Sequence, residues 1–215
     1  MKIVIGIISY LPDDTGRRNV RSELVSNLVQ RCKELFDLPI IIVAQNWKDK
    51  NIESKDITIY RYDNPLTIVG ARKELRRIFL ESEYDYLIML DDDCKLYGTS
   101  AENYLRQIYE NPDCWIEKQG SVLKLFAISK SVFAQVDYDD VSLEREEGFE
   151  DWVFFAKLRK LIPPEKHKKF QNCKVWEKSY CTGDPYSTWF KNQPLTEIVK
   201  KTHDHINQYI KEKPE

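Results

Sequence analysis

Three consecutive aspartates, Asp91, Asp92 and Asp93, follow directly on the apolar run Tyr86–Leu90. Adjacent carboxylates repel one another, and this repulsion destabilises the folded chain unless a cation offsets it. Two residues separated by one other residue on an extended chain point the same way, so Asp91 and Asp93 can converge on one metal ion. Oxygen ligands suit Mg²⁺ or Mn²⁺, particularly when substrate phosphates complete the coordination. The triplet therefore predicts a cation site, with a solvated acidic turn as the alternative.

A second acidic pair, Glu150-Asp151, stands at the start of an apolar segment with helical spacing. Carboxylates are favoured at a helix N-terminus, where they interact with the helix dipole. The competing interpretation is that one of the two faces a ligand and acts as a general base. The residues alone leave both interpretations open.

The first ninety residues predict the elements that must position these acids. Continuous apolar runs indicate buried strands, and apolar residues at helical spacing indicate two helices between them. The expected strands are Lys2–Ser9, Pro39–Ala44, Ile57–Tyr62 and Tyr86–Leu90, and the expected helices are Asn19–Phe36 and Ile68–Leu80. This alternation predicts an α/β fold with a mostly parallel, Rossmann-like sheet flanked by helices. Ligands bind such sheets beyond the carboxyl ends of the strands, where the aspartates stand.

The second half of the chain is less regular and contains neither an internal repeat nor a low-complexity linker. The capping-box spacing of Thr99–Glu102 predicts a helix that runs through Tyr109. We expect further strands at Cys114–Glu117, Val122–Ile128 and Cys173–Tyr180, a helix at Phe149–Leu161, and a terminal helix after Pro194.

The composition bounds the class of protein and its partners. The chain has 215 residues, of which 42% are apolar and 32% are charged, as in soluble globular domains. Lys and Arg number 33 against 35 Asp and Glu, so no global basic field favours nucleic acid as a partner. Two local basic stretches, 72–77 and 157–168, leave a polyanionic partner open, although each is more typical of a solvated helix face.

The same composition sets an expectation for the compartment. No apolar run approaches the roughly 20 residues that a membrane helix requires, so we expect no integral membrane segment. The five cysteines show no C-x-x-C spacing, which argues against a zinc ribbon or a disulfide framework and favours reduced thiols. We expect a cytoplasmic protein, with a peripheral position at the membrane left open.

The order of these motifs resembles that of the GT-A fold nucleotide-sugar glycosyltransferases, especially glycosyltransferase family 2. The matching segments, over residues 2–160, are Ser9-Tyr10, Val69-Gly70-Ala71-Arg72-Lys73, the Asp-x-Asp motif Asp91-Asp92-Asp93, and Glu150-Asp151. The resemblance implies a single GT-A-like domain over residues 1–215. Residues 1–97 would form the nucleotide-sugar-binding half, 98–190 the acceptor and catalytic half, and 191–215 a C-terminal helical extension.

The resemblance also implies an activity and a role for individual residues. The protein would be a metal-dependent, inverting glycosyltransferase that moves a sugar from a UDP- or GDP-sugar to an acceptor hydroxyl. Asp91 and Asp93 would hold Mn²⁺ or Mg²⁺ at the diphosphate, and Asp151, with Glu150 beside it, would be the general base. The implied donor contacts are Ser9, Tyr10, Gln45, Arg72, Asp91, Asp92, Ser187 and Thr188, and the implied acceptor contacts are Trp152 and Trp189.

Several points depart from the family pattern or stay open. The second strand ends in Ala44-Gln45-Asn46 instead of an acidic pair, so the choice of nucleotide is open. The amide side chains of Gln45 and Asn46 can still form hydrogen bonds with a base edge or a ribose. Three histidines, His167, His203 and His205, are candidates for a further metal ligand, but a surface or satisfied histidine is the favoured interpretation of each. The alternative interpretation of Arg72 is a solvated arginine on a helix face. The alternative interpretation of Trp152 and Trp189 is that they are core residues. The acceptor is a glycan, a protein, a lipid-linked sugar or a modified nucleobase.

Two other functions compete with glycosyl transfer. A nucleotidyltransferase could use the same acidic metal site, but such enzymes often hold a triphosphate with a glycine-rich basic loop after the first strand. The chain has only seven glycines, and Arg17-Arg18 is a weak substitute for that loop. A non-catalytic cation- or glycan-binding module is the third alternative, without the Asp-x-Asp-x-Asp-Gly loop that would favour Ca²⁺.

Overall fold

The structure, a computed structural model, describes residues 1–13, 15–47, 52, 54–64, 66–92, 94, 101–118, 125–138 and 150–171. At six positions it describes the backbone but not the side chain: Arg17, Lys118, Leu125, Glu150, Asp151 and Trp152. The predicted strand at 173–180 and the predicted terminal helix lie outside the described residues, and the division of the domain at residues 97 and 190 stays a prediction.

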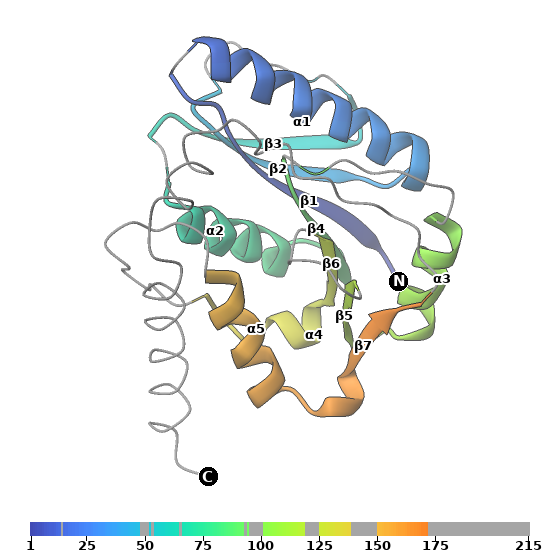
Figure 1. The fold of residues 1–215 in the computed structure, drawn as a ribbon. Helices are drawn as coiled ribbons and strands as arrows, with labels where there is room; N and C mark the ends of the chain where they lie inside the picture. The colour runs from blue at the N-terminus through green and yellow to red at the C-terminus, as the bar shows by residue number, and fades with distance from the viewer. Residues whose placement is uncertain are drawn as a thin grey trace.

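Seven strands form one sheet in the order β3-β2-β1-β4-β6-β5-β7 (Figure 1). The strands are β1 Ile3–Tyr10, β2 Ile40–Gln45, β3 Ile57–Tyr62, β4 Tyr86–Asp91, β5 Trp115–Lys118, β6 Leu125–Ser129 and β7 His167–Phe170. Strands β1 to β4 are parallel to one another, β6 runs antiparallel to both β4 and β5, and β7 is parallel to β5. The sheet is therefore mostly parallel, as the alternating pattern predicted.

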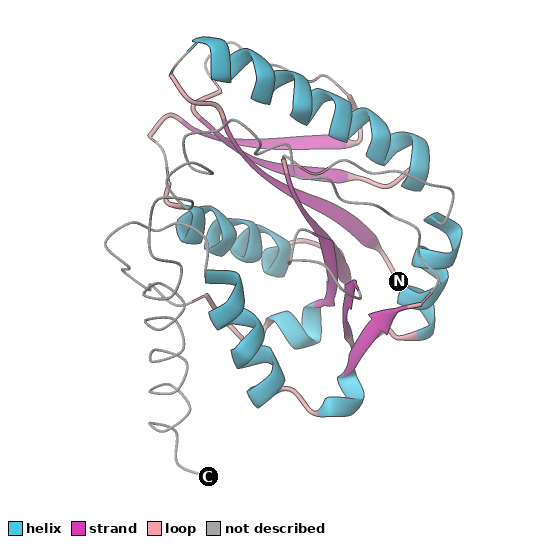
Figure 2. Cartoon of the chain, viewed as in Figure 1, coloured by secondary structure: helices cyan, strands magenta, loops and turns pink. Residues whose placement is uncertain are grey.

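Helices cover both faces of this sheet. They are α1 Thr15–Phe36, α2 Ile68–Glu81, α3 Ala101–Glu110, α4 Lys130–Phe133 and α5 Glu150–Leu161, with a short 3₁₀ helix at Pro164–Lys166. Buried residues of α1 and α3 share one core cluster, and those of α2, α4 and α5 share the other. Figure 2 shows α1 and α2 on opposite sides of the strands. The chain is thus a three-layer α/β domain, and we call its two sides the α1 face and the α2 face.

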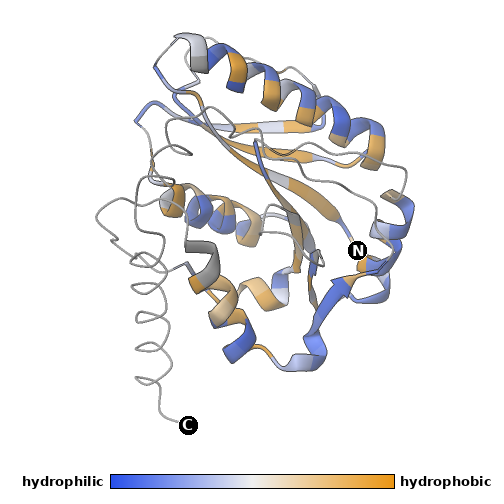
Figure 3. Ribbon diagram, viewed as in Figure 1, coloured by the Kyte–Doolittle hydropathy of each residue, from blue (hydrophilic) through white to orange (hydrophobic). Residues whose placement is uncertain are grey.

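Alternation along β1 feeds both cores at once. Ile3, Ile5 and Ile7 point to the α1 face, whereas Val4 and Ile8 point to the α2 face. All five are buried, because a central parallel strand has a helical layer on each side. Figure 3 shows the central strands as largely hydrophobic, while β7 at the sheet edge is mostly hydrophilic.

The carboxyl ends of the first four strands meet at one edge of the sheet. In the register of the strands, Ile8 is paired with Asp91, and Gln45 is paired with Tyr10 on one side and with Tyr62 on the other. This is the edge at which the sequence placed the aspartates. None of the helices in the described part of the chain is long and apolar enough to cross a membrane.

Candidate functional site

Asp91 and Asp92 lie on opposite faces of the sheet. Successive side chains of a strand alternate between its two faces. Met89 belongs to the α2-face core and Leu90 to the α1-face core, so Asp91 follows toward α2 and Asp92 toward α1. Strand β4 ends at Asp91, and the Cys94 N–H donates to the Asp91 carbonyl at 3.1 Å. The extended backbone assumed in predicting that Asp91 and Asp93 converge therefore stops at Asp91; Asp93 lies outside the described residues.

Arg72 of α2 holds Asp91 from the α2 face. Its Nη2 lies 3.2 Å from Asp91 Oδ1, and the two side chains are 2% and 21% exposed. Helix α2 begins after Thr67, whose hydroxyl accepts a hydrogen bond from the Gly70 N–H, and this start places Arg72 in the second turn, against the strand ends. The alternative of a solvated helix-face arginine is therefore wrong. A buried guanidinium beside a carboxylate stabilises the ionised form of the acid.

Asp92 is held from the α1 face by donors of three kinds. Its Oδ2 accepts hydrogen bonds from the Ser9 hydroxyl at 2.7 Å and from the Tyr10 N–H at 3.3 Å. Its Oδ1 accepts one from Arg21 Nη1 at 2.9 Å. The Trp47 indole N–H donates in turn to Ser9 Oγ at 3.3 Å. One carboxylate, only 8% exposed, thus connects the ends of β1 and β4 with α1.

The end of β2 presents a buried amide, that of Gln45. Gln45 is 4% exposed, and within the described part of the chain its Oε1 accepts no hydrogen bond. Its neighbour Val43 belongs to the α2-face core, so alternation puts Gln45 on the same face as Asp91. The next residue, Asn46, has a left-handed backbone (φ 56°) and donates from Nδ2 to the Leu11 carbonyl at 2.9 Å. The chain thus turns away from the sheet while Gln45 stays at the edge.

The basic stretch on α2 is used within the fold. Arg76 Nε donates to the carbonyls of Phe133 and Val136 at 3.0 and 2.9 Å, where α4 ends. Arg77 pairs with Glu74 and Glu81 on its own helix, and this contact lowers the pKa of Glu74. Together with the buried Arg72, these contacts leave α2 no uniform basic face for a polyanion.

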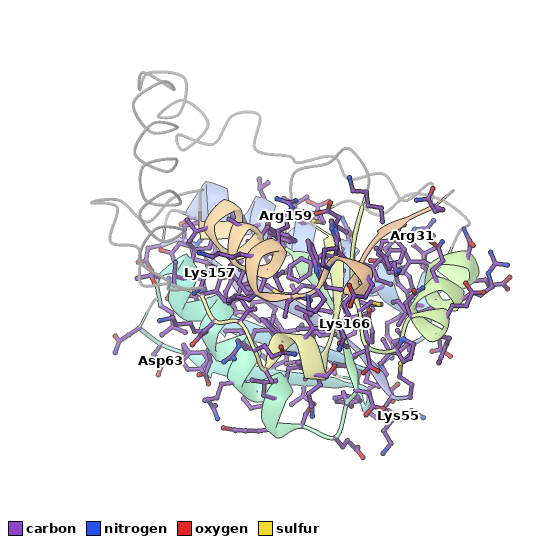
Figure 4. All side chains as sticks on the ribbon, turned by 90° about the horizontal axis from the view of Figure 1, so that it is seen from below. Arg31, Lys55, Asp63, Lys157, Arg159 and Lys166 are labelled. Atoms are coloured by element: carbon purple, nitrogen blue, oxygen red, sulfur yellow. The ribbon has the colours of Figure 1, made fainter. Side chains whose placement is uncertain are left out.

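The second basic stretch is also partly committed to internal contacts. Figure 4 labels Lys157 and Arg159 on α5 and Lys166 before β7. Lys157 is buried and donates to the Asp137 carbonyl at 2.6 Å, and Arg159 pairs with Glu117 of β5 at 3.1 Å. Lys166 directly precedes the edge strand β7 and Lys168 lies within it, where lysine opposes the addition of a further strand.

His167 lies far from the aspartates. In the register of the sheet it is paired with Trp115, which is paired with Ile128 and through it with Leu87, four residues before Asp91 and three strands away. Its ring stacks on Trp115 with centroids 3.9 Å apart, and burial lowers its pKa below the ordinary 6.5 despite the nearby Glu117. These contacts support a structural histidine; His203 and His205 lie outside the described residues.

The remaining predicted site residues are only partly placed. Glu150 and Asp151 open α5, and Trp152 follows them, but their side chains are not described. Ser187, Thr188 and Trp189 lie outside the described residues. No cluster of three or more His, Cys, Asp or Glu side chains suited to a metal occurs in the part of the chain that the structure describes.

Two residues of the site were missed by the sequence analysis, Arg21 and Trp47. Both reach Asp92, directly or through Ser9, from positions 71 and 38 residues away from their partners. No local sequence pattern predicts contacts between residues so far apart in the chain. From sequence alone, Arg21 is interpreted as one more polar residue of an amphipathic helix.

Comparison with known proteins supports the fold. No family model matches the sequence, and no curated protein matches it. Among solved structures, S. aureus TarS 1–349 in complex with UDP-GlcNAc is similar, with a TM-score of 0.60 and 10% identity over 87% of this chain and 61% of that one. A proposed glucose-1-phosphate thymidylyltransferase from Bacillus anthracis gives a TM-score of 0.59 and 11% identity over 86% and 93%. The chain spans about three fifths of the TarS fragment, and its GT-A-like fold is confirmed.

Proposed function

We propose that the chain is a nucleotide-sugar-using transferase and, more narrowly, a metal-dependent, inverting glycosyltransferase. The observation that supports this most is the buried ion pair between Arg72 and Asp91 at the carboxyl end of a central parallel strand. Open α/β sheets bind ligands at this edge. One protein of the same fold was solved with UDP-GlcNAc.

The α2 face of the edge has the groups that a nucleoside needs. The Asp91 side chain is 21% exposed, and a carboxylate can accept hydrogen bonds from ribose hydroxyls. No described residue donates a hydrogen bond to Gln45 Oε1, and a base or a ribose can supply one. Tyr10, half-buried and opposite Gln45 in the register, offers a ring for stacking. Arg72 orients Asp91, and Ser187 and Thr188 are proposed to complete the donor site.

The donor chemistry of the aspartates fits Mg²⁺ or Mn²⁺. Asp91 offers carboxylate oxygen, Asp93 is proposed to add a second carboxylate, and these ions prefer oxygen ligands shared with substrate phosphates. Because the described residues alone do not form a three-ligand cluster, phosphate oxygens would supply part of the coordination. When bound, the ion would stabilise the charge of the departing nucleoside diphosphate.

The acceptor would be activated by the start of α5. Phe154, Phe155 and Leu158 pack this helix into the α2-face core, so its first residues have a rigid support. Asp151, with Glu150 beside it, is proposed to take the proton from the acceptor hydroxyl, whose oxygen displaces the diphosphate in line and inverts the anomeric carbon. Trp152 and Trp189 are proposed to line the acceptor side.

Nucleotidyl transfer is the second candidate, because the chain covers most of the Bacillus anthracis structure. The loop after β1 argues against it. Arg18, one of the two arginines that could hold a triphosphate, lies with Nη1 at 3.5 Å from the carbonyls of Leu11 and Pro12. It is therefore used to hold the loop itself.

Thermal unfolding against a panel of ligands tests the proposal. The panel contains UDP, GDP, UDP-GlcNAc, a GDP-hexose, and dTTP with glucose 1-phosphate, each with and without Mn²⁺. A ligand at 100 times its Kd stabilises the folded state by about 2.7 kcal/mol. For a chain of this size that raises Tm by roughly 5–10 °C.

We expect one nucleotide sugar to raise Tm with Mn²⁺ and this shift to be lost in Asp91→Asn. The shift should persist in Arg77→Gln, a control on the exposed face of α2, the helix that carries Arg72. Turnover of that donor should be lost in Asp151→Asn. A shift with dTTP alone would favour nucleotidyl transfer. No shift with any member of the panel would refute the proposed function.

A further inference from the structure

The contacts of Asp92 give it a role that differs from that of its neighbours. Its side chain is 8% exposed, and both of its oxygens accept hydrogen bonds from the protein. Ser9, which the resemblance pairs with the nucleotide, is 2% exposed and donates to Asp92. A ligand could reach either group only by displacing an internal bond.

The partners of Asp92 are arranged as an anchor. Arg21 reaches it from α1, the Ser9 hydroxyl and the Tyr10 N–H reach it from β1, and Trp47 bonds Ser9 from the end of β2. A buried carboxylate is strongly destabilising without such partners. Its position therefore follows that of Arg21 and of the two strand ends.

The anchor reinforces the direction that the alternation of β4 gives to Asp91. Adjacent residues at a strand end face opposite sides, so holding Asp92 on the α1 face directs Asp91 to the α2 face. There Arg72 meets it. Two arginines from opposite helical layers thus hold two adjacent aspartates, and the end of β4 is kept in one orientation.

We propose that Arg21 is a positioning residue for donor binding: with Ser9 and Asp92 it holds the end of β4, so that Asp91 faces the donor. This inference rests on the proposed function. It assigns Ser9 and Asp92 to supporting the site instead of contacting the nucleotide. Arg21 of α1 contacts Asp92 on the α1 face of the sheet, opposite the α2 face that carries Arg72 and Gln45.

The first test measures donor affinity. Arg21→Gln, Arg21→Lys and the control Arg31→Gln are compared for binding of UDP, GDP, UDP-GlcNAc and a GDP-hexose with Mn²⁺. Arg31 belongs to the same helix but pairs at the surface with Glu34. Loss of a residue that orients a ligating group typically weakens affinity about 10–100-fold.

We expect Arg21→Gln to weaken binding at least about tenfold at a temperature where all variants are folded, following the same relation. Arg21→Lys should recover part of the loss, and Arg31→Gln should bind as the wild type does. Ser9→Ala should weaken binding, and the Ser9→Ala effect should shrink in the Arg21→Gln background, because residues of one network are not additive. Unchanged affinity in Arg21→Gln together with weakened affinity in Ser9→Ala would overturn the proposal.

The second test needs no nucleotide. The coupling between Arg72 and Asp91 in the free energy of unfolding is measured by a double-mutant cycle, once in the wild type and once in Arg21→Gln. If Arg21 positions Asp91, the coupling falls in the variant. Unchanged coupling would refute the positioning role, whether or not any nucleotide binds. Failure of every nucleotide to bind would refute the proposed function alone.

Discussion

The ion pair between Arg72 and Asp91 allows a quantitative test of the site. Arg72→Met removes the guanidinium but keeps a long side chain, and Asp91→Asn removes the charge with little change of shape. The two single variants and the double variant form a thermodynamic cycle. Because the Arg72 side chain is only 2% exposed, water cannot replace its lost partner.

The magnitude follows from the burial of the two partners. Removing one member of a buried pair costs about 3–5 kcal/mol. Asp91 is 21% exposed, so water compensates part of the loss, and the asparagine amide keeps one hydrogen bond to Arg72. We therefore expect a loss of about 2 kcal/mol in each single variant, and a coupling of about 1–2 kcal/mol, within the range for residues in contact.

The assay is urea unfolding near neutral pH, at low salt and at about 1 M salt, where charges at the surface are screened within roughly 3 Å. The coupling should persist at high salt because the pair is buried. The pair of Arg77 and Glu81, both more than half exposed, is the matched control and should show a smaller coupling that salt removes. A coupling of zero, or one that salt removes as it does in the control, would refute the reasoning.

Three further predictions concern pH and packing. The hydrogen bond from Arg77 lowers the pKa of Glu74, so the stability that ionised Glu74 contributes is present above the ordinary pKa of 4.5 and is lost as pH falls through the lowered value. The difference in unfolding free energy between wild type and Glu74→Gln should therefore narrow over that range, and a constant difference would contradict the prediction. Burial lowers the pKa of His167, so the wild type should lose stability as pH falls below 6.5, whereas His167→Gln should lose less over the same range; parallel curves of stability against pH would contradict this. A Cβ at Gly6 would lie 2.7 Å from Leu87 Cδ1 of β4 and 2.9 Å from Leu75 Cδ2 of α2, so Gly6→Ala should cost about 1–3 kcal/mol by overpacking, and an unchanged Tm would show that these two leucine side chains move aside freely.

The central strands and the first two helices could be predicted from sequence for a physical reason. A parallel strand with helices on both faces is apolar throughout, and β1 to β4 begin and end within one residue of the predicted bounds. Strand β7, with the sequence His-Lys-Lys-Phe, has no such pattern. It forms because it pairs with β5 and because Phe170 stacks on Tyr104 of α3, at 3.7 Å between ring centroids.

The sequence placed the aspartates at the correct edge but did not show how they are oriented. Their position follows from the end of β4, a local property of the apolar run. The arginines that hold them, Arg21 and Arg72, are 71 and 19 residues away from their partners. The prediction that Asp91 and Asp93 share a metal assumed an extended chain, whereas the backbone turns between Asp91 and Cys94. That shared site stays a prediction.

The two arginines also change the argument from charge repulsion. From the sequence, repulsion within the acidic triplet was expected to destabilise the folded chain unless a cation offsets it, but Arg21 and Arg72 already bring positive charge to Asp92 and Asp91. The folded chain should therefore tolerate the triplet without metal, and a metal would serve the diphosphate of a donor instead. We expect a chelator to leave Tm unchanged in the absence of nucleotide and to abolish only the additional stabilisation that a nucleotide sugar gives. Because a metal that binds only the folded state adds to its stability, a fall in Tm on chelation alone would show that the ion, and not the arginine pair, holds this edge of the sheet together.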